Sequence, residues 1–190
     1  KRMNKDRYLV VVSGPSGCGK DTVVRRLRAL HPEIELSVSA TSRPMRAGEA
    51  EGVDYYYMSR EEFQQKIQAG EILEHAEYSG NLYGTPKSEV DKRIGQGRTV
   101  VLVIEVEGAG NIRKLYPEAT TVFLMPPSME QLEARLRGRG TEDEASIQRR
   151  LARAREEMEY APLYTTTLVN DEVEACADRL YEIIRQRQQA

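Results

Sequence analysis

The sequence is poor in cysteine, lacks tryptophan and carries no excess of either charge. Its 190 residues include two cysteines, Cys18 and Cys176, and their positions form no ligand or disulfide pattern, which favours a reducing cytoplasm. The formal net charge of -2 argues against broad binding to nucleic acids or anionic membranes. We therefore expect a cytoplasmic protein without nucleic-acid or membrane partners.

Long hydrophobic runs are also missing. No apolar run approaches the roughly 18 residues that a membrane span needs, and the first residues show no signal-peptide core. The segment KRMNKDR (Lys1–Arg7) is expected to be a short solvated lead-in, and it leaves open whether Met3 is the native start. A chain of this length forms about one domain, with room for insertions and a substantial core.

Short apolar runs are present instead. They are Tyr8–Val12, Thr99–Ile104, Thr121–Met125 and the weaker Thr167–Val169. Runs of this length with many β-branched residues indicate strands that are buried on both faces. Helix-like stretches follow three of them, at Asp21–Leu30, Ser128–Arg137 and Glu172–Arg187. This alternation predicts an α/β fold with a parallel sheet and right-handed crossovers, and the polar, tyrosine-rich segment Ser39–Lys87 is expected to be an insertion.

The stretch GPSGCGKDT (Gly14 to Thr22) directly follows the first apolar run. It nearly matches the phosphate-binding pattern G-x-x-x-x-G-K-[ST], in which glycines let backbone N–H groups turn inward and the lysine reaches the terminal phosphates. The N-terminus of the following helix adds partial positive charge. A glycine-rich turn without a ligand is the alternative, which the lysine and the flanking elements together disfavour. Cys18 is interpreted as a small filler residue in this loop.

Asp21 departs from that pattern, because it occupies the position whose hydroxyl normally meets Mg²⁺. A carboxylate aimed at phosphate oxygens would repel them by about 4 kcal/mol at 4 Å in an effective dielectric of 20. Asp21 must therefore face the cation, through a water molecule, or face away from the phosphates. In the second case it would stabilise the start of the helix by about 0.3–1 kcal/mol. We favour the metal interpretation and leave the helix interpretation open.

The segment SVSATSRPMRAGEAEGVDYYY (Ser37–Tyr57) concentrates polar residues suited to binding a phosphate group. Arg43 and Arg46, three residues apart in a loop with proline and glycine, can converge on one phosphate, since the planar guanidinium group matches its oxygens bidentately. The phenol of Tyr55 would add a hydrogen bond. For such an arginine pair in isolation, a solvated loop would be the better interpretation.

Four further strings follow in order: ILEHAEYSGNLYGTP (Ile72–Pro86), VIEVEGAG (Val103–Gly110), RLRGRGTEDEASIQRRL (Arg135–Leu151) and LVND (Leu168–Asp171). Together with the loop and the insertion they resemble guanylate kinase, of the P-loop nucleoside monophosphate kinase family, which moves the γ-phosphate of ATP onto GMP. The resemblance extends from about Tyr8 to Leu180. One departure is Gly108–Ala109, where family members usually have a bulky or apolar residue followed by Gln.

The resemblance implies an α/β fold of the P-loop NTPase type. A five-stranded parallel sheet flanked by helices would carry a small mixed α/β GMP-binding insertion and a helical lid. Residues 1–36, 90–126 and 158–190 would form the core, 37–89 the GMP-binding region and 127–157 the lid. ATP and GMP would be the small-molecule partners and Mg²⁺ the cofactor, while the oligomeric state stays open.

The resemblance also implies a role for each motif residue. The ATP-binding residues would be Gly14, Pro15, Ser16, Gly17, Cys18, Gly19, Lys20, Asp21 and Thr22, with Asn170 touching adenine. The GMP phosphate would be held by Ser39, Arg43, Arg46, Tyr55 and Tyr83, with Glu49 supporting them, and the base would be read by Glu74, Thr85 and Glu107. The catalytic charges would be Lys20, Arg46, Arg135, Arg139 and Arg150. Glu105, at the end of a buried strand, would join Asp21 near the water shell of Mg²⁺.

Two other functions are compatible with parts of this pattern. Ribose 1,5-bisphosphate kinases share the fold and also have Asp at the position of Asp21, but their substrate has no base for Glu74, Thr85 and Glu107 to read. Guanine offers two donors and one acceptor, which two carboxylates and a hydroxyl complement, whereas each mispaired group of adenine would cost about 1–3 kcal/mol. A catalytically silent binding module is the second alternative, disfavoured because the residues of the ATP site are all present.

Overall fold

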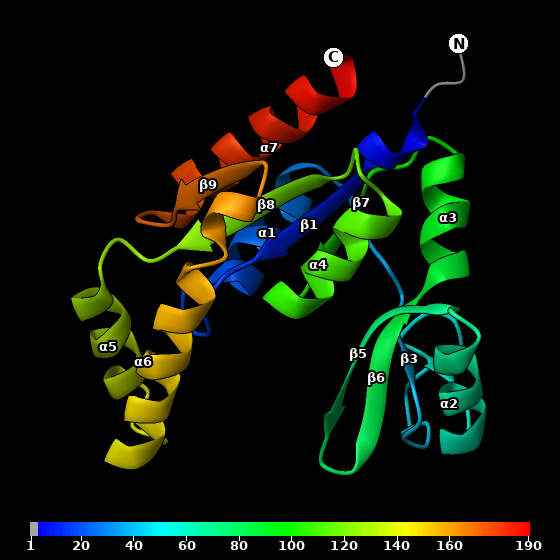
Figure 1. Ribbon diagram of the computed structural model, residues 1–190, viewed down its shortest axis with the longest axis horizontal. Helices are drawn as coiled ribbons and strands as arrows, with labels where there is room; N and C mark the ends of the chain where they lie inside the picture. The colour runs from blue at the N-terminus through cyan, green and yellow to red at the C-terminus, as the bar shows by residue number, and fades with distance from the viewer. Residues whose placement is uncertain (1–3) are drawn as a thin grey trace.

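The computed structural model describes residues 4–190 and contains a five-stranded parallel sheet at its centre (Figure 1). The strands are β1 (Leu9–Ser13), β2 (Glu35–Leu36), β7 (Val100–Val103), β8 (Thr120–Met125) and β9 (Thr166–Val169). Their order is β2-β7-β1-β8-β9, and every neighbouring pair is parallel. The predicted sheet is confirmed. Its edge strand β2 gave no signal in the sequence, because two residues are too few to form an apolar run.

Several predicted boundaries were wrong by a residue or more. The first three residues of the expected lead-in lie outside the described part of the chain. Its remainder is ordered: Lys5–Tyr8 form a 3₁₀ turn, η1, in which the Asn4 side chain accepts a hydrogen bond from the backbone of Asp6. Strand β7 stops at Val103, so Glu105 does not end a strand. It is instead the N-cap residue of helix α4 (Val106–Leu115).

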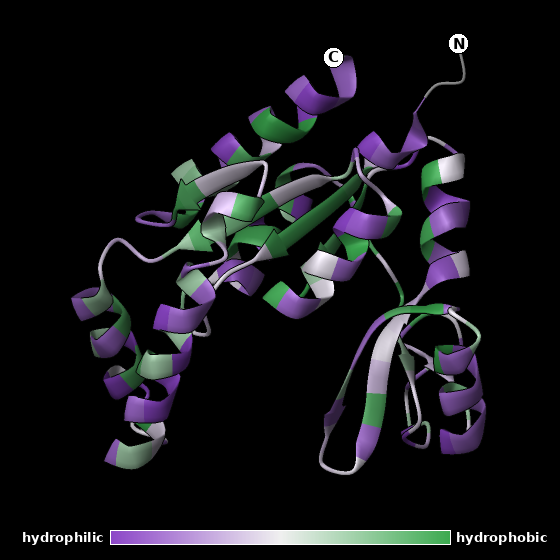
Figure 2. Cartoon of the chain, in the orientation of Figure 1, coloured by the Kyte–Doolittle hydropathy of each residue, from purple (hydrophilic) through white to green (hydrophobic). Residues whose placement is uncertain are grey.

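Helices cover both faces of the main sheet, and strand β1 shows why. Leu9 and Val11 point into one apolar cluster with residues of α3 (Lys87–Gly95) and α4. Val10 and Val12 point into the other, with residues of α1 (Lys20–Leu30) and α7 (Val173–Gln189). Neighbouring side chains of a strand alternate between faces, so a run that is apolar throughout fills both cores. Figure 2 shows this apolar sheet beneath helices with polar outer faces.

The insertion forms a second, smaller sheet beside helix α2 (Arg60–Gln68). Its strands are β3 (Ala40–Thr41), β4 (Tyr56–Tyr57), β5 (Ile72–Tyr78) and β6 (Asn81–Pro86), in the order β4-β3-β6-β5. A core of its own, centred on the fully buried Phe63, packs α2 against this sheet. Ser79 and Gly80, both with positive φ, make the tight turn of the β5–β6 hairpin. The insertion is thus a mixed α/β unit, as predicted.

Helices α5 (Met129–Gly138) and α6 (Glu144–Met158) form a pair that follows strand β8 and projects from the sheet (Figure 1). Ser128 and Asp143 cap the two helices with side-chain hydrogen bonds to backbone N–H groups. The pair has a small core of Leu132, Leu136, Ile147, Leu151 and Ala154. The division into core, GMP-binding region and lid stays a prediction. Among the helices of residues 4–190, none combines the length and apolarity needed to cross a membrane.

Candidate active site

The predicted phosphate loop joins strand β1 to helix α1 and is fixed by close packing. Gly17 and Gly19 have φ values of +89° and +84°, which favour glycine. A Cβ at Gly14 would lie 2.4 Å from the carbonyl oxygen of Leu124, so the loop starts in contact with strand β8. The Nζ of Lys20 donates to the Gly14 carbonyl at 3.1 Å, across the loop. The N-terminus of α1 has no side-chain cap, which leaves its N–H groups for an anion.

Asn170 lies behind this loop at the end of strand β9. It is only 3% exposed, and its side-chain Nδ2 donates to the Cys18 carbonyl at 2.8 Å. Its own backbone N–H donates to the Met125 carbonyl at 2.8 Å. The side chain thus supports the loop, and the contact with adenine that the resemblance implied stays a prediction. Cys18 is a free, buried thiol whose pKa is raised by burial, consistent with a packing role.

The predicted lid arginines differ in how near they lie to the loop. Arg150 in α6 donates to the Ser16 hydroxyl at 3.4 Å and pairs with Glu142 at 2.7 Å. Arg135 in α5 reaches the backbone carbonyl of Asn170 at 3.5 Å. Arg139 is exposed just after α5, and within residues 4–190 it has no hydrogen-bonded side-chain partner. The structure thus brings two of the three to the loop.

The predicted phosphate-binding arginines form a cluster around Glu49, Arg43 through its guanidinium group and Arg46 through its backbone. Arg43 donates two hydrogen bonds of 2.7 Å to the two oxygens of Glu49, and the backbone N–H of Arg46 donates a third at 2.8 Å. These bonds lower the pKa of Glu49 to about 2, and the side chain of Arg43 contributes most. The guanidinium group of Arg43 lies 5.0 Å from the ring centroid of Tyr55, which packs edge-on against Tyr83. The structure therefore brings together four predicted phosphate ligands and their support.

A cavity of about 390 Å³ opens between the second sheet and the start of α4, and it gathers the other predicted GMP residues except Thr85, which lies buried next to it. Its lining includes Ser39, Glu74, Tyr83, Glu105 and Glu107. Glu74 comes from strand β5, and its carboxylate accepts a hydrogen bond of 2.6 Å from the hydroxyl of Thr85 on β6. Burial raises the pKa of Glu74, and the bond from Thr85 partly offsets this. The cavity therefore exposes a half-buried carboxylate that the buried hydroxyl of Thr85 orients from behind.

Gly108 allows helix α4 to approach Glu74. A Cβ at this glycine would lie 3.0 Å from the Cβ of Glu74, which is tighter than ordinary contact. A bulky residue at this position would therefore push the two elements apart. The departure from the family pattern at Gly108 thus brings α4 against strand β5.

Glu107, on the first turn of α4, pairs with a residue that the sequence did not single out. Arg153 of α6 donates to Glu107 at 2.7 Å and lies 3.7 Å from Glu105. It also lies 3.5 Å from Glu157 on its own helix. Burial acts to raise the pKa of Glu107, but the hydrogen bond from Arg153, a backbone hydrogen bond and the charge of Arg153 together outweigh it, and the pKa lies below its ordinary value. The one signal for Arg153 in the sequence was its four-residue spacing from Glu157 on a polar helix face. That spacing is typical of solvated helix surfaces and does not indicate a site.

Comparison with known proteins decides the family. The guanylate kinase family profile matches residues 6–187. The chain belongs to the guanylate kinase family. It shares 52% identity over 170 residues with a guanylate kinase of Synechococcus sp. (strain CC9311), covering 90% of each chain. With a guanylate kinase of Thermosynechococcus vestitus it shares 51% identity over 166 residues, 87% of each chain. The crystal structure of guanylate kinase from Anaplasma phagocytophilum matches with a TM-score of 0.70 and 37% identity, covering 96% of this chain and 86% of that one.

The candidate metal residues of this guanylate kinase family member are single carboxylates at the rim of the phosphate loop. Asp21 is exposed in the first turn of α1. Glu105 follows β7 at the carboxyl end of the sheet's strands, where the loop also begins after β1. Within residues 4–190, no group of three or more His, Cys, Asp or Glu side chains is placed to hold a metal ion. Mg²⁺ bound with a nucleotide keeps several waters and needs only one or two carboxylates besides the phosphates, so the residues present fit that ion.

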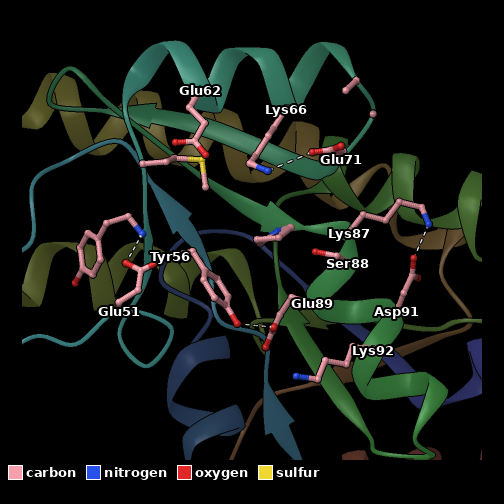
Figure 3. A pocket seen from close by; sticks show the side chains of 15 residues that line it. Glu51, Tyr56, Glu62, Lys66, Glu71, Lys87, Ser88, Glu89, Asp91 and Lys92 are labelled. Carbon is pink, nitrogen blue, oxygen red and sulfur yellow. Dashed lines mark hydrogen bonds and ion pairs between the residues drawn. The ribbon is translucent and has the colours of Figure 1, made fainter.

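A larger cavity, of about 950 Å³, lies away from the predicted guanylate kinase site, between α2 and α3 (Figure 3). None of the residues predicted for ATP, GMP or Mg²⁺ lines it. Two ion pairs lie among its charged side chains, Lys66 with Glu71 at 3.3 Å and Lys87 with Asp91 at 2.5 Å. Tyr56 donates to Glu89 at 2.8 Å and so ties the second sheet to helix α3. This cavity marks the junction between the insertion and the core.

Proposed function

We propose that this protein, as a guanylate kinase, transfers the γ-phosphate of ATP to GMP and releases ADP and GDP. The observation that carries the proposal is the shared cavity of Glu74 and Glu107, with Thr85 bonded to Glu74. Two carboxylates and a hydroxyl complement the two donors and the acceptor of guanine. Glu105 lines the same cavity and lies at the carboxyl end of the strands, where the phosphate loop begins. The proposed base-reading site therefore adjoins the proposed phosphate-binding loop.

On the GMP side, the Arg43 cluster would hold the phosphate. Glu49 fixes the guanidinium group of Arg43 by two hydrogen bonds, so the fork needs little further ordering when the phosphate arrives. Arg46 is exposed beside it and would turn to the same phosphate. Ser39, Tyr55 and Tyr83 would add hydroxyl groups. We propose residues 37–89 as the GMP-binding region.

On the ATP side, the loop from Gly14 to Thr22 would cradle the phosphates, and Lys20 would place its charge on the migrating group. The acceptor is a phosphate oxygen, so the reaction needs alignment and positive charge rather than a special general base. Arg135 and Arg150 already lie at the loop. Arg139 would join them when the segment 127–157 closes as a lid, with Gly138 and Gly140 allowing the movement. Closure would also keep water from the γ-phosphate.

Two finer points belong to the same proposal. Mg²⁺ would accompany ATP and neutralise phosphate charge, with Asp21 and Glu105 near its water shell. Asn170 would support the loop through the hydrogen bond of its Nδ2 to Cys18 and would touch adenine as the resemblance implies. The two cysteines are free and buried, which supports a reducing compartment such as the cytoplasm.

The substrate test compares GMP with AMP, CMP, UMP and ribose 1,5-bisphosphate as acceptors, with ATP and Mg²⁺ as donor. GMP should give the highest kcat/KM, because each mispaired buried group costs about 1–3 kcal/mol, or roughly tenfold to more than a hundredfold. ADP formation in a coupled assay measures it. Equal or better turnover of ribose 1,5-bisphosphate would overturn the base-reading role, and a lack of turnover with any acceptor would favour a binding module.

Asp21→Ala tests the metal side of the proposal. If Asp21 holds a water of the Mg²⁺ shell, the variant should need several-fold more free Mg²⁺ for half-maximal rate, while KM for GMP stays unchanged. A Mg²⁺ titration of the initial rate measures this, with the exposed Asp178→Ala on α7 as the control for loss of one negative charge. If Asp21 only stabilises the start of α1, the Mg²⁺ curve should not move, and the variant should lose about 0.3–1 kcal/mol of stability.

A further inference from the structure

One arginine outside every predicted motif links the lid helices to the base pocket. Arg153 of α6 donates to Glu107 at 2.7 Å, and it stands 3.7 Å from Glu105. Among the ion pairs of residues 4–190, these two are the pairs that join α6 to α4 and its N-cap. The carboxylate proposed to read guanine is therefore engaged by Arg153 in this structure.

The chemistry sets Arg153 and guanine in competition. An arginine–carboxylate hydrogen bond is assisted by both charges and is roughly twice as strong as a bond between neutral groups. Arg153 donates to one oxygen of Glu107, and guanine brings neutral N–H donors to the same carboxylate, so GMP competes with Arg153 for its orientation. The side chains of Arg153 and Glu107 are 45% and 56% exposed. Because water screens such a pair, its effect on an equilibrium is modest, about two- to fivefold.

Glu157 gives Arg153 a second partner. It lies one turn along the same helix, 3.5 Å from the Nε of Arg153, and its side chain is buried. When Glu107 turns to a substrate, the guanidinium group keeps a carboxylate beside it. Arg153 thus has two possible arrangements. In one it pairs with both Glu107 and Glu157, and in the other it pairs with Glu157 alone.

We propose that Arg153 is a positioning residue that restrains Glu107 in the substrate-free protein and yields it to the base of GMP. The inference rests on the proposed base-reading role of Glu107. Its consequence is that Arg153 lowers the affinity for GMP and leaves the affinity for ATP unaffected. A residue with only a structural role would not separate the two substrates in this way.

The test measures GMP binding to the intact chain by calorimetry and KM for both substrates by steady-state kinetics. Arg153→Gln should lower the Kd and KM of GMP about two- to fivefold and leave KM for ATP unchanged. Arg155→Gln is the matched control, since it removes the same charge from the same helix. Arg155 is exposed and has no ion pair in the described part of the chain, so this variant should bind GMP as the unchanged protein does.

A second comparison shows whether the effect passes through Glu107. In a Glu107→Ala background, Arg153→Gln should no longer change the Kd of GMP. An unchanged or raised Kd for Arg153→Gln alone would overturn the inference, as would an equal gain in the Glu107→Ala background. Failure of the proposed function looks different, because the unaltered protein would then not phosphorylate GMP at all.

Discussion

Lys20→Ala should lower kcat for GMP phosphorylation by about 10²- to 10³-fold, the usual cost of removing one preorganised charge stabiliser from a transition state. In the structure, the Nζ of Lys20 already spans the loop to the Gly14 carbonyl at 3.1 Å. The amino group is therefore positioned before ATP arrives. KM for GMP should stay nearly constant, because the phosphate cluster around Arg43 is built from a separate part of the chain. Initial rates at saturating ATP and GMP measure the effect.

Lys114→Ala is the matched control for this variant. Lys114 is an exposed lysine on α4, and its loss should leave kcat unchanged. Thermal melting of both variants checks that the fold is intact. A Lys20→Ala protein that keeps more than about a tenth of its kcat would contradict the role assigned to the loop lysine.

Glu74→Gln should raise KM for GMP by about tenfold to more than a hundredfold, with KM for ATP unchanged. A carboxylate only accepts hydrogen bonds, whereas an amide would turn a donor toward the donors of guanine, at a cost of about 1–3 kcal/mol. The hydroxyl of Thr85, which donates to Glu74 at 2.6 Å, fixes the direction from which the carboxylate meets the base. Equal effects on the two substrates would contradict the base-reading role.

The raised pKa of Glu74 adds a pH dependence to this prediction. Burial holds the pKa of this carboxyl above its ordinary value of 4.5, and only the ionised form presents acceptors alone to guanine. Protonation would turn an O–H donor toward the N–H donors of guanine, so in the unaltered protein kcat/KM for GMP should fall as the pH drops through the raised pKa, and Glu74→Gln should lose that component. Because protonation of Glu74 favours the folded state, its ionised form costs stability above that pKa. The glutamine variant should therefore melt no earlier than the unaltered protein at neutral pH.

The sequence predicted those parts of the fold that depend on local pattern. Continuous apolar runs such as Tyr8–Val12 were sufficient to predict strands buried on both faces. The phosphate loop was predictable from the spacing of its glycines and lysine. Strand β2 was missed because Glu35–Leu36 pairs with β7 in tertiary context without any pattern of its own. Element ends were misplaced where a cap decides them, as at Glu105.

The candidate site was predictable where the motif itself supplies the contact. The pairing of Arg43 with Glu49 lies within one short loop, and both residues were named. Asn170 was also named, but its burial behind Cys18 depends on packing between segments far apart in the chain. Arg153 was missed for the same reason: its spacing to Glu157 is that of a solvated helix, and only the fold brings it to Glu107.

The hydrogen bonds of Asn170 give the phosphate loop a fixed anchor. Its backbone holds the Met125 carbonyl, at the end of strand β8, and its side chain holds the Cys18 carbonyl in the loop. The chain leaves the sheet for α5 and α6 immediately after Met125. The point from which those helices depart is thus tied to the loop they face. In the proposed lid closure, a swing of α5 and α6 about that point would change the distance of their arginines from the bound phosphates and leave the loop in place.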